Sequence, residues 1–207
     1  MNATPNLERS LRYLLAWAPA VEAAKTTLAR RTVPDAALHA GTLGFQARTT
    51  LGQLIGATTS VTGSILGARD YTRTRGWVDA PLATVATGTR WADRALRAAL
   101  DVERHPTMHF TLRGATVVAA SLGGQDVTTL LLHGSLTLRG VTRRVELPAT
   151  ITRSAAISRV TSSFSIDVAD YGIVALTKLF GLARVQPRIL VRANLWFVDR
   201  LNESANP

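Results

Sequence analysis

The feature that most constrains the fold is the stretch Leu130–Ile151, which reads LLLHGSLTLRGVTRRVELPATI. Apolar and polar side chains alternate along both halves, the pattern of a β-strand with one buried face. Between the halves stands Arg139-Gly140, where glycine can take the positive φ that a tight reversal needs. The stretch therefore predicts a β-hairpin. Arg143 falls on its apolar face near the turn, where a long stem can lie along the wall while the guanidinium reaches an anionic group.

The same period of two recurs from Leu38 to Val198 and predicts an all-β domain. Besides the hairpin, strands are expected at 38–48, 60–65, 77–87, 107–113, 116–122, 157–168 and 189–198. About eight antiparallel strands can close into an up-and-down barrel that either fills with its own side chains or holds one ligand. We expect the first and last strands to pair near Phe45 and Val191, because closure removes the exposed sheet edges.

One short helix is expected inside this β region. Residues 91–103 carry apolar side chains at helical spacing, and His105-Pro106 stops the pattern. The helix should cross one end of the barrel with its apolar face buried. That predicted face consists of Trp91, Ala95, Leu96, Ala99 and Leu100.

The inward faces of the strands predict a ligand cavity. Twelve of the predicted ligand-contacting side chains are apolar residues of strands: Phe45, Val61, Ile65, Met108, Phe110, Leu130, Leu132, Leu136, Val160, Phe164, Val191 and Leu195. Arg143 and Tyr171 are expected at its mouth, and Ile173 begins an apolar segment beside it. Burying a lipid tail there would gain about 0.8 kcal/mol for each methylene removed from water.

Catalytic chemistry finds little support in the sequence. Without cysteine, the chain has no disulfide, no thiolate nucleophile and no thiolate metal site. Its four histidines lack helical i, i+4 pairing and close carboxylate companions in the sequence, so no metal is expected. No nucleophile elbow, P-loop or dinucleotide fingerprint is present. The alternative to a binding protein is an enzyme that uses the same cavity, with His105, Tyr171 or Arg143 at its mouth.

The charge balance is strongly basic. With 24 basic against 14 acidic residues the net charge is +10, and the pI is near 11.4. Such a surface attracts an anionic membrane surface or other polyanions. The basic residues are scattered as singles and pairs without interleaved aromatics, which argues against nucleic-acid binding. The expected partner is a hydrophobic small molecule or lipid, and a homodimer is left open.

The two ends of the chain differ from its middle. Residues 1–34 predict a helical extension with a break at Pro19, and residues 201–207 a polar tail, which leaves 35–200 as the barrel. A secretion signal is the rival for the N-terminus, because Ala18-Pro19-Ala20 matches a cleavage pattern, although the apolar core before it is short. No stretch approaches the ~20 apolar residues of a membrane span, so a soluble chain is expected.

Four segments in the same order resemble the YceI-like family. Two are specific: LHGSLTLRGVTRRVELPATI, from Leu132 to Ile151, and SSFSIDVADYGI, from Ser162 to Ile173. Two are weaker, namely 87–110 and 59–65. The resemblance implies an extended lipocalin-like barrel around a long apolar cavity. The expected ligand is an isoprenoid, a quinone-like lipid, a fatty amide or another amphiphilic lipid. It also implies a periplasmic or secreted protein, whereas the lack of a clear signal peptide favours the cytoplasm.

Overall fold

The computed structural model describes residues 33–50, 52–67, 70–121, 126–173 and 185–200. Residues 1–32 of the predicted helical extension lie outside this part of the chain. So do the predicted tail at 201–207 and the apolar segment that follows Ile173.

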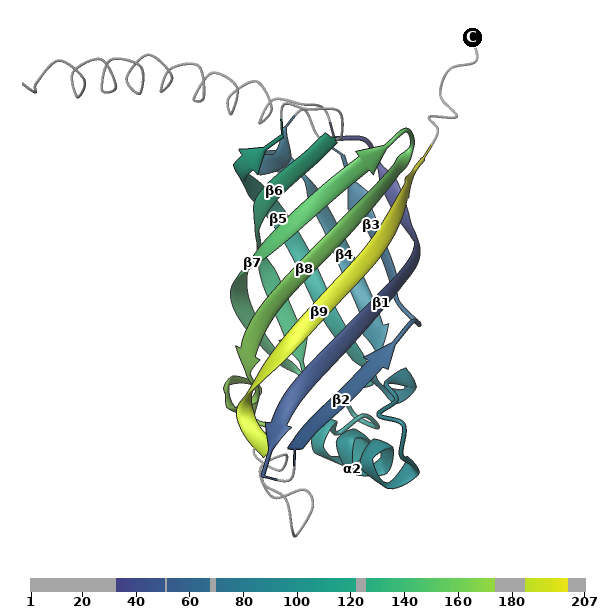
Figure 1. Cartoon of the computed structure of the whole chain (residues 1–207), viewed down its shortest axis with the longest axis vertical. Helices are drawn as coiled ribbons and strands as arrows, with labels where there is room; N and C mark the ends of the chain where they lie inside the picture. The colour runs from purple at the N-terminus through teal and green to yellow at the C-terminus, as the bar shows by residue number, and fades with distance from the viewer. Residues whose placement is uncertain (1–32, 51, 68–69, 122–125, 174–184, 201–207) are drawn as a thin grey trace, which may run out of the picture.

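The described residues form one antiparallel sheet that closes on itself as a barrel (Figure 1). The first strand pairs with the last along almost its whole length, and Phe45 lies opposite Val191, as the sequence predicts. The strands are β1 Ala36–Thr49, β2 Gly52–Thr58, β3 Thr62–Leu66, β4 Arg75–Pro81, β5 Thr107–Ala120, β6 Asp126–Leu138, β7 Val141–Ser154, β8 Ile157–Asp167 and β9 Val185–Asp199.

The strands β2 and β3 share one position in the barrel. β2 pairs with the second half of β1 from Leu43 onward, and β3 pairs with Ala36 and Ala37 at the start of β1. Nine strands therefore fill eight positions, which confirms the predicted barrel size. The sequence prediction missed β2 because the adjacent Leu54 and Ile55 interrupt the alternation that marks a half-buried strand.

The strand β5 is continuous where the sequence predicts two strands. Its pairing with β6 shifts register between Leu112 and Gly114, and again between Val117 and Ala119. Each shift is a bulge, which inserts an extra residue and reverses the alternation of side chains beyond it. Gly114 takes a φ of 148°, which few other residues adopt. Because the alternation of side chains reverses at the bulge, the sequence pattern of β5 resembled two separate strands.

The hairpin of β6 and β7 confirms the strongest prediction from the sequence. Its pairing runs without a shift from Asp126 opposite Arg153 to Leu138 opposite Val141. At the turn Arg139 and Gly140 both have positive φ, at 49° and 74°. Two such residues make the tight turn whose twist matches that of the flanking strands.

The helix α2 (Arg90–Leu100) lies at one end of the barrel, together with two short 3-10 helices, η2 (Leu82–Thr84) and η3 (Val168–Tyr171) (Figure 1). It ends at Leu100, earlier than predicted, because Asp101 takes a left-handed conformation with φ 51°. The prediction that Trp91 lies on the buried face is wrong. Its side chain is 61% exposed, and the buried stripe consists of Ala92, Leu96, Ala99 and Leu100. The buried face of the helix therefore begins at Ala92, one residue after the predicted start at Trp91.

The core has two parts that lie towards opposite ends of the barrel. The cluster at the helix end joins α2, η2 and η3 to residues such as Leu136 and Leu138 near the turn of the hairpin. The second cluster contains Ala36, Val160, Leu195 and Phe197. Between them, many inward side chains are half-buried, although they face the inside of the barrel. No helix in the described part of the chain has the length and apolarity of a membrane span.

The first prediction concerns the attachment of α2. The Asp93 carboxylate accepts hydrogen bonds from the Thr87 hydroxyl and the Thr87 N–H, both at 2.7 Å. These bonds, the hydroxyl first, lower the pKa of Asp93 from its ordinary value of 3.8. Their contribution to stability is complete above the ordinary pKa and is lost as the pH falls through the lower, folded-state pKa. We expect Asp93→Asn to lower Tm at neutral pH and to match the wild type in strong acid.

Thermal unfolding across pH tests this expectation. Asp101→Asn is the matched control, because it removes the same charge beside the same helix and asparagine tolerates the left-handed conformation. Its carboxylate makes one long ion pair, at 3.9 Å to Arg104. A constant difference in Tm between Asp93→Asn and the wild type at every pH would contradict the prediction.

Candidate functional site: the interior of the barrel

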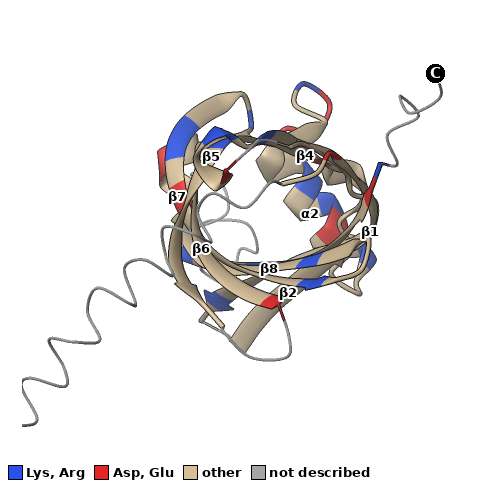
Figure 2. Cartoon of the chain, turned by 90° about the horizontal axis from the view of Figure 1, so that it is seen from above, with Lys and Arg blue, Asp and Glu red and all other residues tan. Residues whose placement is uncertain are grey.

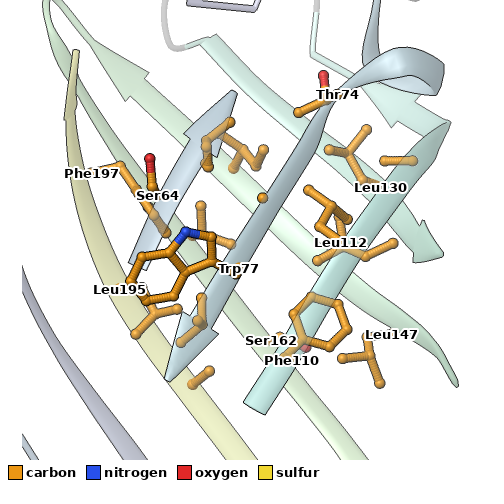
Figure 3. A pocket seen from close by; sticks show the side chains of 18 of the residues that line it. Ser64, Thr74, Trp77, Phe110, Leu112, Leu130, Leu147, Ser162, Leu195 and Phe197 are labelled. Carbon is orange, nitrogen blue, oxygen red and sulfur yellow. The ribbon is translucent and has the colours of Figure 1, made fainter. Parts of the chain in front are cut away.

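The middle of the barrel holds a cavity of about 120 Å³, counted as the space open to the centre of a water molecule. We call it the central cavity. Its wall takes residues from every strand except β2, and carbon atoms make up almost all of its surface. Figure 3 shows Leu112 and Leu130 on one side of this space, with Leu195 and Phe197 on the other. Inward alternation on antiparallel strands produces this convergence.

A second apolar cavity lies next to it, at the end of the barrel that α2 covers. This helix-end cavity measures about 80 Å³ by the same count, and Leu82, Leu96 and Leu100 belong to its wall. Leu43 and Met108 line both cavities. The two spaces therefore lie end to end along the barrel, with these two side chains at the junction.

The opposite end of the barrel carries a third, more polar space of about 40 Å³, the mouth cavity. Figure 2 views the barrel from this end, with α2 visible beyond the ring of strands. Three of its apolar residues, Ile65, Ile151 and Val160, also line the central cavity. Its polar side chains are Tyr71, Asp126, Thr128, Arg153, Ser158 and Asp199.

Most of the side chains predicted to contact a ligand line the apolar cavities. The predicted residues in the wall of the central cavity are Ile65, Met108, Phe110, Leu130, Leu132, Leu136, Val160, Phe164 and Leu195. Those in the wall of the helix-end cavity are Phe45, Met108, Ile173 and Val191. Contact between these residues and a lipid stays a prediction.

Three predicted site residues are placed elsewhere. Val61 packs against the second core cluster and is not part of the wall of these cavities. Arg143 is exposed, and its Nε donates to the Asp170 carbonyl oxygen at 3.0 Å, so it ties β7 to η3. It is not part of the walls of the three cavities described above. The backbone oxygen of η3 takes the place of the anionic group that the sequence suggested.

Tyr171 is buried in the core cluster at the helix end, with 2% of its surface exposed. Burial raises the pKa of its phenol, and the neighbouring Asp170 raises it further, while Arg143 acts in the opposite direction. A phenol with a raised pKa keeps its proton at neutral pH. The environment of Tyr171 fits a packing role better than proton transfer with Asp170.

Comparison with known proteins settles the family. The profile of the YceI-like domain matches residues 35–197, which is most of the chain and the whole of the described barrel up to β9. The chain belongs to the YceI-like family. No curated protein matches this YceI-like chain.

Several solved structures share the YceI-like fold. A polyisoprenoid binding domain from Saccharophagus degradans is 19% identical, with a TM-score of 0.69, over 81% of this chain and 100% of that domain. Burkholderia cenocepacia BcnA is 14% identical, with a TM-score of 0.61, over 75% of this chain and 95% of that one. The Campylobacter jejuni YceI protein is 16% identical, with a TM-score of 0.54, over 70% of this chain and 85% of that one. At identities this low, the structural similarity establishes a shared fold and nothing more.

Two histidines of this YceI-like barrel have carboxylate partners on neighbouring strands, which the spacing in the sequence did not indicate. His109 pairs with Asp79 and with Thr111, and His133 Nδ1 lies 3.2 Å from Glu146 Oε1. These pairs are partly exposed. In the described part of the chain, no three His, Asp or Glu residues come together as a metal site.

The sequence reasoning also missed functional candidates of the YceI-like barrel. Leu43 at the junction was recognised as a strand residue but was not assigned to the cavity. The polar residues of the mouth cavity were missed because the search followed apolar side chains. Counting the inward face by twos to the end of each strand would have found them: Asp126 continues from Leu130, and Asp199 from Leu195.

Proposed function

We propose that this protein binds one long apolar lipid, such as an isoprenoid or a quinone, inside its barrel and carries it without chemical change. The observation that carries the proposal is the pair of carbon-lined cavities that lie end to end and share Leu43 and Met108 in their walls. A narrow apolar space closed at one end by α2 suits a chain better than a compact molecule. The fold shared with a polyisoprenoid binding domain adds support.

The energetics favour long tails. Each methylene transferred from water to the cavity gains about 0.8 kcal/mol, so about ten carbons gain about 8 kcal/mol. That gain is of the same size as the cost of immobilising a ligand, which ranges over about 4–15 kcal/mol. A tail of about twenty carbons gains twice as much and exceeds the cost. Selection for a long chain therefore follows from the apolar wall alone.

The alternative for the inward side chains is that they simply fill the barrel as a core. Leu132, Phe110 and Phe164 argue for an open interior, because each is half-buried although it lines the central cavity. An empty apolar cavity forfeits dispersion contacts along its wall. A lipid tail would restore these contacts and stabilise the folded state.

Lipid extraction of the purified protein, followed by mass spectrometry, tests the proposal. We expect a co-purified long-chain lipid and a higher Tm for the loaded protein than for the delipidated one, since a ligand that binds only the folded state stabilises it. Protein that contains no lipid and takes up none from a mixture of isoprenoid lipids would contradict the proposal.

The enzymatic alternative rests on His105, Tyr171 and Arg143, and none of them lines the cavities described above. Tyr171 is buried in the core, and Arg143 is bound to the Asp170 carbonyl. The imidazole of His105 lies close to Gly140 at the hairpin turn. These placements favour carriage over catalysis. Recovery of a chemically altered lipid after incubation would reverse that preference.

The junction between the cavities gives a prediction about chain length. We expect Met108→Trp to separate the helix-end cavity from the central cavity, because Met108 lines both. Affinity for a tail long enough to need both cavities should fall about tenfold or more, as about two lost methylenes already account for that ratio. Affinity for a short tail should change less. Equilibrium binding of a graded isoprenoid series measures both effects.

The control for Met108→Trp is Val118→Trp on the same strand. Val118 is 53% exposed, so its replacement adds the same side chain without entering a cavity. An equal loss of affinity for short and long tails in Met108→Trp would contradict the role of this junction.

A further inference from the structure

The inward-facing rows of four neighbouring strands change from apolar to polar at the mouth end. On β6 the row Leu132-Leu130 continues through Thr128 to Asp126, and on β9 the row Leu195-Phe197 ends at Asp199. The rows of β7 and β8 end in the same way. Arg153 follows Ile151, and Ser158 precedes Val160.

These polar residues are neighbours across the sheet. Asp126 lies opposite Arg153, and Arg153 lies opposite Ser158. Arg153 also pairs with Asp199 of β9, through a hydrogen-bonded contact between its Nη2 and the Asp199 Oδ2. Four consecutive strands thus place one continuous polar belt along one side of the mouth cavity, next to the apolar wall.

The ion pair within this belt is incomplete. The side chains of Arg153 and Asp199 are 25% and 16% exposed, so both are largely shielded from water. The second oxygen of Asp199, Oδ1, is buried and has no hydrogen-bond partner among the residues that the structure describes. A buried acceptor without a donor is costly. A ligand that brings a hydroxyl donor to this carboxylate would remove that cost.

Among the described residues, the mouth cavity is lined by more carboxylates than basic groups. The ionisable side chains that line the mouth cavity among the described residues are Asp126, Asp199 and Arg153. Two carboxylates thus stand beside one guanidinium. Asp126 makes a further interaction of its own, whereas the Asp199 Oδ1 faces no donor. A phosphate brought to this partly shielded site would meet like charge at short range, where screening is weak.

We propose that the mouth cavity binds the head group of a neutral lipid that donates a hydrogen bond, an alcohol or a phenol, and discriminates against the phosphate ester of the same lipid. This inference rests on the proposed function and adds the head-group class. Ile65, Ile151 and Val160 line both the mouth cavity and the central cavity, so a head group bound at the belt leaves its tail in the apolar space.

Three probes with one tail test the inference on the delipidated full-length chain: geranylgeraniol, its methyl ether and its monophosphate. Their affinities are measured by displacement of the neutral fluorophore N-phenyl-1-naphthylamine. The alcohol is expected to bind about tenfold more tightly than the ether, which lacks the donor, and more tightly still than the phosphate. The tail is constant, so these ratios report the head group alone.

Variants assign the preference to the belt. Asp199→Asn removes the negative charge and should reduce the preference for the alcohol over the phosphate about tenfold. Asp126→Asn makes the same charge change and leaves the carboxylate of the Arg153–Asp199 ion pair in place. It should reduce the preference in the same direction even if Asp199→Asn fails to fold. Glu146→Gln is the matched control, because Glu146 lies on the outer wall beside His133 with 67% of its side chain exposed.

The outcomes separate this inference from the function on which it rests. Equal affinities of the wild type for all three probes would overturn the head-group inference and leave lipid binding intact. An unchanged preference in both Asp126→Asn and Asp199→Asn, or an equal change in Glu146→Gln, would also overturn it. Failure of the wild type to bind any of the three would overturn both proposals.

Discussion

Replacing Leu132 with tryptophan is expected to lower the affinity for a long-chain lipid by about 100-fold while the barrel stays folded. Leu132 lines the central cavity and is half-buried although it points inward. The indole would occupy space that otherwise holds about four methylenes of the tail, worth about 3 kcal/mol of binding. Equilibrium lipid binding measures the loss, and circular dichroism with thermal unfolding verifies the fold.

The neighbouring Leu131 supplies the control for this substitution. It lies on the same strand with its side chain on the opposite face, and it is absent from the wall of the central cavity. Leu131→Trp should therefore keep wild-type affinity. If Leu132→Trp instead unfolds the protein, the interior is a packed core, and the open cavity on which carriage depends would be refuted.

The largest expected effect on stability comes from the smallest change in the hairpin, Gly134→Ala. A Cβ at this position would lie 2.3 Å from the Thr111 carbonyl oxygen and 2.8 Å from the Phe110 ring. Backbone of β5 would have to move, because the nearest atom belongs to the main chain of the paired strand. We expect the free energy of unfolding to fall by about 3 kcal/mol, at the upper end of overpacking costs, and Tm to fall by roughly 6–12 °C.

Gly44→Ala is the same substitution at a position with room for it. The nearest atoms to a Cβ at Gly44 are 3.5 and 3.7 Å away, which is ordinary contact distance. Its effect on stability should be small, because alanine also restricts the unfolded chain. Equal unfolding free energies for Gly134→Ala and Gly44→Ala, measured by urea titration, would show that β5 accommodates the methyl group without strain.

The barrel could be predicted from the sequence because its determinants are local. Alternation in Leu130–Ile151 and the turn at Arg139-Gly140 are properties of residues close together in the chain, and the structure reproduces both. Closure between Phe45 and Val191 followed from one physical requirement, the pairing of free edges. Most of the apolar cavity wall followed from the same alternation.

The errors occur where the local period breaks. The bulge at Gly114 reversed the alternation within β5, and adjacent apolar residues in β2 concealed a strand. A one-residue error in the helical stripe assigned Trp91 to the buried face. The position of Arg143 depended on η3, whose carbonyl at Asp170 no pattern near the hairpin could place.

What the sequence by itself determined is thus most of the strands, most of their inward faces and the closed barrel, because each follows from a period of two and from pairing between strands. Only the tertiary structure decided that Leu43 and Met108 stand between two cavities, and that Asp126, Arg153, Ser158 and Asp199 form one belt. The residues of the belt come from strand ends far apart in the chain, and their contacts depend on barrel register. That register is set by closure of the whole sheet, which no single segment encodes.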